Sequence, residues 1–346
     1  MTDPDGFALL EAQGLHRTFG KGANSVTALD DVSFSVASGE TVVLVGESGS
    51  GKTTAARVIL GLETPDRGSV RIGGRETRGL SERDWRQVRR SIQVVLQDPM
   101  SQLNRRHNVE RIVSAPLLAY RIGDKESRRL RVMELLEAVG LEERHLKRRP
   151  HEMSGGQCQR VAIARALALE PKLVVLDESV SALDVSVRAQ VLNLLKGLQS
   201  RMNLSYLLIT HDLAVARYMG HRTFVMFNGR IVESGVTESV LANPQHPYTV
   251  SLLDSTPSGN LGIDRRHLTE APVRSVPSPE PGDQCRFLAR CDFSQSRELC
   301  RGHRPDLVLV GPDHHAACHF PQGFDRPSLE PVTTDRGSPD PEERTP

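Results

Sequence analysis

The stretch Gly46-Glu47-Ser48-Gly49-Ser50-Gly51-Lys52-Thr53 follows an apolar run at residues 41–45 and precedes a helical pattern at residues 54–62. Glycines let a backbone fold so that its amide hydrogens face one anion, and the helix that follows adds the positive end of its dipole. A strand, this loop and a helix, in that order, form the setting in which the pattern binds nucleotide phosphates. The alternative, a flexible Gly-Ser turn, requires a chance match in that same setting.

We therefore predict that Lys52 bridges the β and γ phosphates of a nucleotide and that the Thr53 hydroxyl is a ligand of Mg²⁺. The candidate nucleotide contacts in this loop are Gly46, Glu47, Ser48, Gly49, Ser50, Gly51, Lys52, Thr53 and Thr54.

Three further apolar runs, at residues 92–96, 173–176 and 206–209, are each followed at once by polar residues. Such runs alternate with longer helical patterns up to residue 243, which is typical of an α/β domain with a largely parallel sheet. In open sheets of this class, ligands bind outside the carboxyl ends of the strands. We therefore expect the functional residues at these strand ends.

The acids Asp177 and Glu178 end the run at residues 173–176. Phosphoryl transfer needs a neutralised charge and an oriented nucleophile, so we expect Asp177 beside Mg²⁺ and Glu178 beside an attacking water. Gln97 and His211 follow the other two runs. Taken alone they could be a loop glutamine and a helix-capping histidine, but their place at the same sheet edge favours a role in the site.

A second glycine-rich segment, Ser154-Gly155-Gly156-Gln157, precedes an apolar-periodic helix. One interpretation is that Ser154 only caps this helix. The other is a second anion site, because two glycines at a helix amino terminus offer free amides. One nucleotide does not need two such sites in one monomer.

Composition excludes several classes of protein. The 44 lysines and arginines balance 43 acids, giving a net charge of +1, which offers no argument for a nucleic-acid binder. No run approaches the ~18 apolar residues of a membrane span, and the amino terminus lacks the apolar segment of a secretory signal, so a reducing cytoplasm is expected. From Pro244 onward the chain carries 15 of its 21 prolines and four of its five cysteines.

Other segments have simpler patterns. Small antiparallel strands are expected near residues 32–36 and 70–72, and a hairpin over residues 224–232 with an Asn228-Gly229 turn. Residues 100–152 are purely helical in pattern, and Gly140 is a plausible helix stop. Residues 254–283 resemble a linker, and residues 321–346 are expected to be disordered.

The order and spacing of these motifs resemble those of ABC transporter ATPases: Walker A, Q-loop, signature, Walker B, D-loop and H-loop. The resemblance implies an α/β P-loop NTPase fold, with an ABC ATPase core, an antiparallel β subdomain, a helical subdomain and a C-terminal domain containing cysteines. The corresponding ranges are 1–99 and 153–243 for the core, 100–152 for the helical subdomain, 244–320 for the C-terminal domain and 321–346 for the tail.

The resemblance also implies roles. Glu178 resembles the catalytic carboxylate, His211 the contact to the γ phosphate, Gln97 the link from Mg²⁺ to the helical subdomain, and Asp184 the residue that communicates across a dimer. In the implied head-to-tail dimer, Ser154, Gly155, Gly156 and Gln157 of one subunit contact the γ phosphate held by Lys52 of the other. Phe19 matches an aromatic that stacks on adenine, with core packing as its alternative. Implied cofactors are ATP and Mg²⁺, the latter held by Thr53, Gln97 and Asp177.

A narrower resemblance, to the oligopeptide/dipeptide importer subfamily, covers nearly the whole chain. It rests on Gln97-Asp98-Pro99, Pro150-His151-Glu152, residues 181–187 and 243–249, and the cysteine-bearing region. Val180 before Ser181 resembles the second of two paired ATPases. The implied partners are therefore a second ATPase subunit in a heterodimer, two transmembrane permease subunits docked on residues 100–152, and an extracytoplasmic solute-binding protein. The implied location is peripheral, on the cytoplasmic face of the inner membrane.

Two other functions stay open: a non-transport ABC ATPase that remodels DNA or ribosomes, and an ATP-regulated metal or redox sensor. The first predicts a long coiled coil or two cassettes in one chain, and the intact Glu178 and His211 argue against the second.

The sequence departs from the family pattern at four positions. Met153 replaces the usual signature leucine, Cys158 an arginine, Ser179 the proline after Glu178, and Arg105 a proline beyond the Q-loop. Ser179 is expected to loosen the turn after Glu178, and Cys158 removes a positive charge near the signature helix.

Four cysteines, Cys285, Cys291, Cys300 and Cys318, are separated by 5, 8 and 17 residues. Thiols in a reducing compartment are more often metal ligands than disulfides, and no short Cys-x-x-Cys step of a zinc site is present. We expect a [4Fe-4S] cluster with a structural role, with zinc or no metal as alternatives. Substitute ligands would be His303, His314, His315 and His319.

Overall fold

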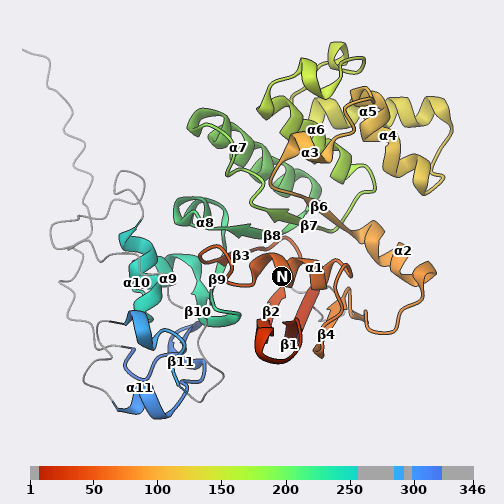
Figure 1. Cartoon of the computed structure of the whole chain (residues 1–346). Helices are drawn as coiled ribbons and strands as arrows, with labels where there is room; N and C mark the ends of the chain where they lie inside the picture. Colours follow the sequence, from red (N-terminus) through yellow and green to blue (C-terminus); the bar gives the residue numbers. More distant parts are fainter. Residues whose placement is uncertain (1–7, 256–283, 292–297, 322–346) are drawn as a thin grey trace, which may run out of the picture.

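The larger of two sheets contains both the phosphate loop and the other polar strand ends. The computed structural model describes residues 8–255, 284–291 and 298–321 (Figure 1). Within them, this sheet has the strand order β11-β12-β10-β9-β3-β8-β7-β6. The bounds are β3 (Thr41–Val45), β6 (Ile92–Val95), β7 (Leu173–Asp177), β8 (Ser205–Thr210), β9 (Arg222–Phe227), β10 (Arg230–Val236), β11 (Val308–Gly311) and β12 (His314–Ala316).

The four apolar runs of the sequence form β3, β6, β7 and β8, as predicted, and these strands are parallel neighbours. Leu176 is level with Val95 of β6 and Leu208 of β8, and Thr210 is level with Val45 of β3. The carboxyl ends of all four strands therefore meet at one edge of the sheet.

A smaller antiparallel sheet packs beside the larger one, in the order β2-β1-β4-β5. Its strands are β1 (Leu10–Phe19), β2 (Val26–Val36), β4 (Arg67–Ile72) and β5 (Arg75–Glu76). The expected strands at residues 32–36 and 70–72 are thus confirmed. The alternation of β1 is broken by register shifts at Ala12, Leu15 and Arg17, which is why its period-2 pattern escapes detection in the sequence.

The hairpin turn at Asn228-Gly229 is confirmed. Both residues have positive φ, 43° and 80°, the combination that a two-residue type I′ turn requires. The turn joins β9 to β10.

Residues 100–152 contain only helices in the structure, as predicted. They hold most of α3 (Pro99–Gln102), then α4 (Val109–Ala119), α5 (Lys125–Ala138) and the short turns η2 (Glu143–His145) and η3 (Pro150–Glu152). Gly140, with φ of 71°, lies just past α5. These helices group around α6 (Gly155–Leu167) at one end of the molecule (Figure 1).

The remaining helices lie outside residues 100–152. They are α1 (Lys52–Ile59), α2 (Glu82–Ser91), α7 (Val185–Met202), α8 (Leu213–Met219), α9 (Thr237–Ala242), α10 (Pro247–Asp254) and α11 (Leu299–Gly302), with η1 (Gly22–Asn24) and η5 (Leu288–Arg290) as single turns. Among them, α1, α2, α8 and α9 contact strands of the sheets. None of the described helices is both long and apolar enough to cross a membrane.

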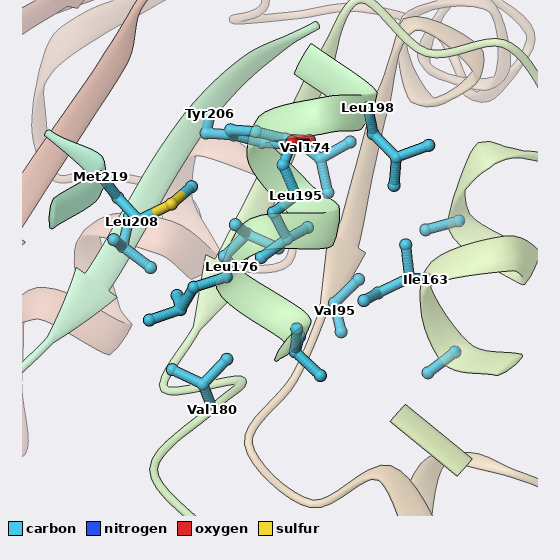
Figure 2. Packing of buried hydrophobic residues seen from close by; sticks show 14 of the residues in the cluster. Val95, Ile163, Val174, Leu176, Val180, Leu195, Leu198, Tyr206, Leu208 and Met219 are labelled. Atoms are coloured by element: carbon cyan, nitrogen blue, oxygen red, sulfur yellow. Dashed lines mark hydrogen bonds between the residues drawn. The ribbon is translucent and has the colours of Figure 1, made fainter. Parts of the chain in front are cut away.

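One core cluster joins the larger sheet to its helices. Figure 2 shows Leu176 and Leu208 of the strands facing Leu195 of α7, with Ile163 of α6 alongside. Tyr206 is buried among them, and its hydroxyl donates to the Leu195 carbonyl at 2.9 Å. The packing fixes the strands of the polar edge against α6 and α7.

The sheet continues into the last part of the chain. β12 pairs with β10, so that Glu233, Ser234 and Gly235 lie opposite Ala316, His315 and His314. The two strands β11 and β12 at one edge of the sheet therefore come from residues 308–316, beyond the proline-rich region. The expected linker and tail lie almost wholly outside the described residues.

Candidate functional site

The loop between β3 and α1 needs glycine at two positions. Gly46 has a φ of 155°, and a Cβ there would lie 2.3 Å from the Met226 carbonyl oxygen. Gly51 has a φ of 107°, and its Cβ would meet the Ala28 oxygen at 2.4 Å. Both contacts are too close for any side chain. The loop is thus held against β2 and β9 by its own backbone.

Lys52 is buried beneath the loop. Its Nζ donates to the carbonyl oxygens of Gly46 and Glu47, both at 2.7 Å, and to Ser50 Oγ at 3.2 Å. Burial lowers the pKa of Lys52, while the charges of Glu178, Asp177 and Glu47 act in the opposite direction. The ammonium group is therefore placed among the acids expected to form the site. Helix α1 begins at Lys52, two residues before the expected start, because left-handed Gly51 occupies its N-cap.

Asp177 ends β7 beside Lys52. Burial raises the pKa of Asp177, the charge of Glu178 raises it further, and Lys52 and Arg57 lower it. A partly buried carboxylate whose charged form is disfavoured by burial and by a neighbouring acid is stabilised by a divalent cation. Mg²⁺ commonly takes one or two carboxylates plus substrate phosphates rather than a full protein cage. Asp177 and the hydroxyl of Thr53, the second residue of α1, offer the oxygen ligands that this ion prefers.

Glu178 and His211 come together across the strand ends. The Glu178 amide donates to the Ile209 carbonyl at 2.9 Å, and the Glu178 carboxylate lies 3.3 Å from His211 Nδ1. Ser181 closes the turn after Glu178, since its amide and hydroxyl donate to the Glu178 carbonyl at 3.1 and 2.8 Å. Ser179 is buried, and its hydroxyl has no hydrogen-bond partner among the described residues. Ser181 therefore closes the turn, although Ser179 stands where the family pattern has a proline.

Gln97 is exposed just beyond β6, at the same sheet edge. Its strand is in register with β7, which carries Asp177. The structure thus brings together the ends of β3, β6, β7 and β8, with Lys52, Gln97, Asp177, Glu178 and His211, as the strand pattern predicts.

Ser154 caps α6. Its Oγ accepts from the Gln157 amide at 3.2 Å, and Gln157 Oε1 accepts from the Ser154 amide at 3.1 Å. Gly156 has a packing role, because a Cβ there would lie 2.5 Å from Val187 Cγ1. Within a single chain, Ser154 therefore acts as the N-cap of α6.

Two other candidates, Asp184 and Phe19, have local contacts within the chain. Asp184 caps α7, and a hydrogen bond from the Val187 amide lowers the pKa of its carboxyl, with help from Ser186. Phe19 is 36% exposed at the end of β1, with the Arg17 guanidinium 4.7 Å from its ring centroid. Core packing is therefore the wrong interpretation of Phe19.

Cys158 is fully buried and packs in the core near Pro150.

Sequence reasoning missed two residues that contact the phosphate loop. The Tyr248 hydroxyl accepts from the Glu47 amide at 2.8 Å. Arg290 donates to both carboxylate oxygens of Glu47, at 2.7 and 2.8 Å. The contacts span 201 and 243 residues of sequence, so no local pattern could reveal them.

The expected metal cluster at the cysteines is not supported. Of the residues that the structure describes, no three or more His, Cys, Asp and Glu are arranged to hold a metal ion. Burial raises the pKa of Cys285 and raises that of Cys318 to about 11. The described arrangement of Cys285, Cys291, Cys300 and Cys318 therefore gives no support to [4Fe-4S] or zinc ligation.

Two of the four proposed substitute ligands have other partners. His314 is buried, with its Nε2 2.7 Å from the Glu233 carboxylate. His319 Nε2 lies 2.9 Å from the His303 carbonyl oxygen. His315 lies within β12.

Comparison with known proteins decides the family. A model described as ABC transporter matches residues 29–181, and one described as Oligopeptide/dipeptide transporter, C-terminal region, matches residues 232–300. A di/tripeptide transport ATP-binding protein of Pseudomonas aeruginosa is 41% identical over 308 residues, which cover 88% of this chain and 93% of the relative. The chain belongs to the ABC transporter family.

Further ABC relatives agree. A probable peptide ABC transporter ATP-binding protein of Sinorhizobium fredii is 43% identical over 85% of this chain and 82% of its own length. A solved dimeric ATP-binding cassette in a post-hydrolysis state with ADP and Pi matches with a TM-score of 0.60 and 33% identity, covering 66% of this chain and 98% of that one. Part of an ABC transporter complex from Clostridium perfringens matches with a TM-score of 0.61 and 28% identity, and the match covers 68% of this chain and 91% of that one. As a member of this family, the chain is an ATPase.

Proposed function

We propose that this ATPase powers the import of di- or oligopeptides, or similar small solutes, through partner membrane subunits. The observation that carries the proposal is the match of residues 232–300 to the oligopeptide/dipeptide transporter C-terminal region, in the same chain as the ATPase core. The relatives that cover most of this chain have names that include peptide transport, which supports the same substrate class.

At the site, we assign the triphosphate to the amides of the phosphate loop and to Lys52. Thr53, Asp177 and Gln97 would hold Mg²⁺, which supplies positive charge against the phosphates when bound. Glu178 accepts a proton from the attacking water, which makes the water a better nucleophile. His211, 3.3 Å from Glu178, orients that carboxylate and reaches toward the γ phosphate. Phe19 is exposed and offers its ring to adenine.

The proposed assembly is a head-to-tail dimer, in which a partner completes the site. Residues 154–157 would contact the γ phosphate bound by the other subunit. Asp184 would communicate between the two nucleotide sites across the dimer. We infer a heterodimer with a related ATPase. Residues 100–152 would dock two permease subunits, served by an extracytoplasmic solute-binding protein. The complex would place this chain at the periphery of the inner membrane, on its cytoplasmic face.

A tagged full-length chain, expressed in its source organism and extracted with its membranes, tests the proposal. We expect a second ATPase and two membrane subunits to co-purify. A deletion strain should lose uptake of a labelled dipeptide. The wild-type chain should restore uptake, and so should the control Lys172→Ala, which changes an exposed lysine at the opposite end of β7, whereas Lys52→Ala should not. Co-purification with DNA or ribosomes, or unchanged dipeptide uptake, would reject peptide import.

A further inference from the structure

Glu47, the second residue of the phosphate loop, is held by two side chains from far along the chain. Arg290 of η5 forms a two-pronged ion pair with its carboxylate, and the Tyr248 hydroxyl of α10 accepts from its amide. The carboxylate is 43% exposed and the guanidinium 30% exposed. On the inner side of the loop, Lys52 binds the Glu47 carbonyl. The peptide groups on both sides of Glu47 are thus fixed.

Arg290 is itself held in place by aromatic rings. Its guanidinium lies 5.5, 5.6 and 5.9 Å from the ring centroids of Phe227, Phe287 and Tyr248. Phe287 is buried at 3% exposure and packs edge-on against Phe227. Arg286 anchors the same segment, because it donates to the Asn228 carbonyl and to Asp30. The segment 284–291 is therefore a built part of the surface beside the loop.

The charge of Glu47 matters for a triphosphate. A free carboxylate on a loop that binds anionic phosphates repels them, whereas one neutralised by a guanidinium repels them much less. The carboxylate is also close enough to Lys52 to influence the charge state of that lysine. Arg290 and Tyr248 hence act on the nucleotide through Glu47 and without touching it.

We propose that Arg290 and Tyr248 are positioning residues of the ATP site: they neutralise and orient Glu47 so that the phosphate loop accepts the triphosphate. The C-terminal region thereby sets the affinity of the core for MgATP. The inference rests on ATP binding at this loop, but not on the substrate that is transported.

The test measures the dissociation constant of MgATP for the full-length chain by calorimetry. Arg290→Met keeps the packing on the aromatic rings and removes the charge, and we expect the dissociation constant to rise about 5–10-fold. Adding Glu47→Gln to Arg290→Met should bring the dissociation constant most of the way back to the wild-type value, because the uncompensated negative charge of Glu47 is then removed. Arg290→Lys, which keeps a cation, should stay closer to the wild type. Tyr248→Phe should give a smaller rise.

The matched control is Arg217→Met, which breaks another arginine–glutamate pair, with Glu238 at 2.6 Å, on the surface between α8 and α9. It should leave MgATP affinity unchanged. Equal affinity of Arg290→Met and Arg217→Met overturns the inference. So does a double variant Glu47→Gln/Arg290→Met that binds no better than Arg290→Met, because loss of structure alone gives no suppression. If the wild-type chain does not bind MgATP, the assignment as an ATPase fails as well. The wild-type measurement therefore distinguishes failure of the ATPase assignment from failure of this inference alone.

Discussion

Glu178 carries an unusual backbone at the centre of the site. Its φ is 44°, a left-handed conformation that costs a non-glycine residue about 1–2 kcal/mol. The conformation is held by the bonds to Ile209 and Ser181, and it directs the carboxylate to His211. Such local backbone strain is typical of functional sites, where the orientation of a side chain is needed for activity.

Replacing this carboxylate tests its role directly. Glu178→Gln keeps size and backbone but no longer accepts a proton, so we expect hydrolysis to fall by about 10²-fold or more while MgATP still binds. Lys52→Ala should instead lose binding. Steady-state hydrolysis and equilibrium binding, measured on the same samples, separate the two effects. Unchanged turnover in Glu178→Gln would falsify the assignment of the base.

His246 gives the fold a dependence on pH. Burial lowers the pKa of His246 to about 3. Below pH 6.5 the unfolded chain takes up a proton at this residue that the folded chain does not, so the free energy of unfolding falls on acidification. The loss is about 1.4 kcal/mol per pH unit between pH 6.5 and 3, or about 2 kcal/mol at pH 5.

His246→Asn keeps an acceptor for the Tyr248 amide, which His246 Nδ1 binds at 3.0 Å, but it does not titrate. We expect the difference in urea-unfolding free energy between pH 7.5 and pH 5 to be about 2 kcal/mol smaller in this variant than in the wild type. Identical differences would mean that His246 protonates equally in both states.

At the scale of elements, β10 joins the ATPase core to the last part of the chain. Glu233 is fully buried on this strand, and its carboxylate accepts from the amides of Gln245 and His246 at 2.7 and 2.9 Å. On the β12 side it lies 2.7 Å from His314 Nε2. One carboxylate therefore fixes the start of α10 and the strand that extends the sheet.

Glu233→Ala leaves two buried amides and a buried imidazole without this acceptor. We expect a loss of about 3–5 kcal/mol in unfolding free energy, the size found when one partner of a buried charged network is removed. Glu238→Ala, which changes an exposed acid on α9, is the control and should cost less than about 1 kcal/mol. Equal midpoints in urea for both variants would contradict the prediction.

The elements also show what sequence reasoning can reach. Continuous apolar runs predict β3, β6, β7 and β8, because strands buried on both faces need no alternation. β1 is missed because its bulges break the period of two. The roles of Tyr248 and Arg290 do not follow from spacing, since contacts across more than 200 residues depend on how the whole chain packs. The iron–sulfur prediction is not supported, because no group of metal-binding side chains is present among the described residues.

At the scale of the whole molecule, the amino terminus of α6, where we expect a second anion site, is hydrogen-bonded only locally among the described residues of one chain. The partners of residues 154–157 in one chain come from residues 145–187. In the assembled transporter, Ser154→Arg should keep MgATP binding at the chain's own loop and abolish hydrolysis at the shared site, since a bulky side chain then blocks the partner.

The control for this variant is Ser81→Arg, which removes the N-cap of α2 at a comparable cost of about 1 kcal/mol. Hydrolysis should survive in that variant. Full activity of the Ser154→Arg complex would show that this helix terminus never meets a nucleotide.

The distance along the chain between Glu47 and Arg290 has a consequence for biosynthesis. The two residues are 243 positions apart, so at about 5–20 residues per second the ribosome needs roughly 12–50 s to make the second after the first. During that interval the nascent protein displays the loop with its acid unpaired. A truncated product ending before residue 284 would stay in that immature form permanently. If Arg290 positions Glu47 as we propose, high affinity for MgATP would be reached only after translation has passed residue 290.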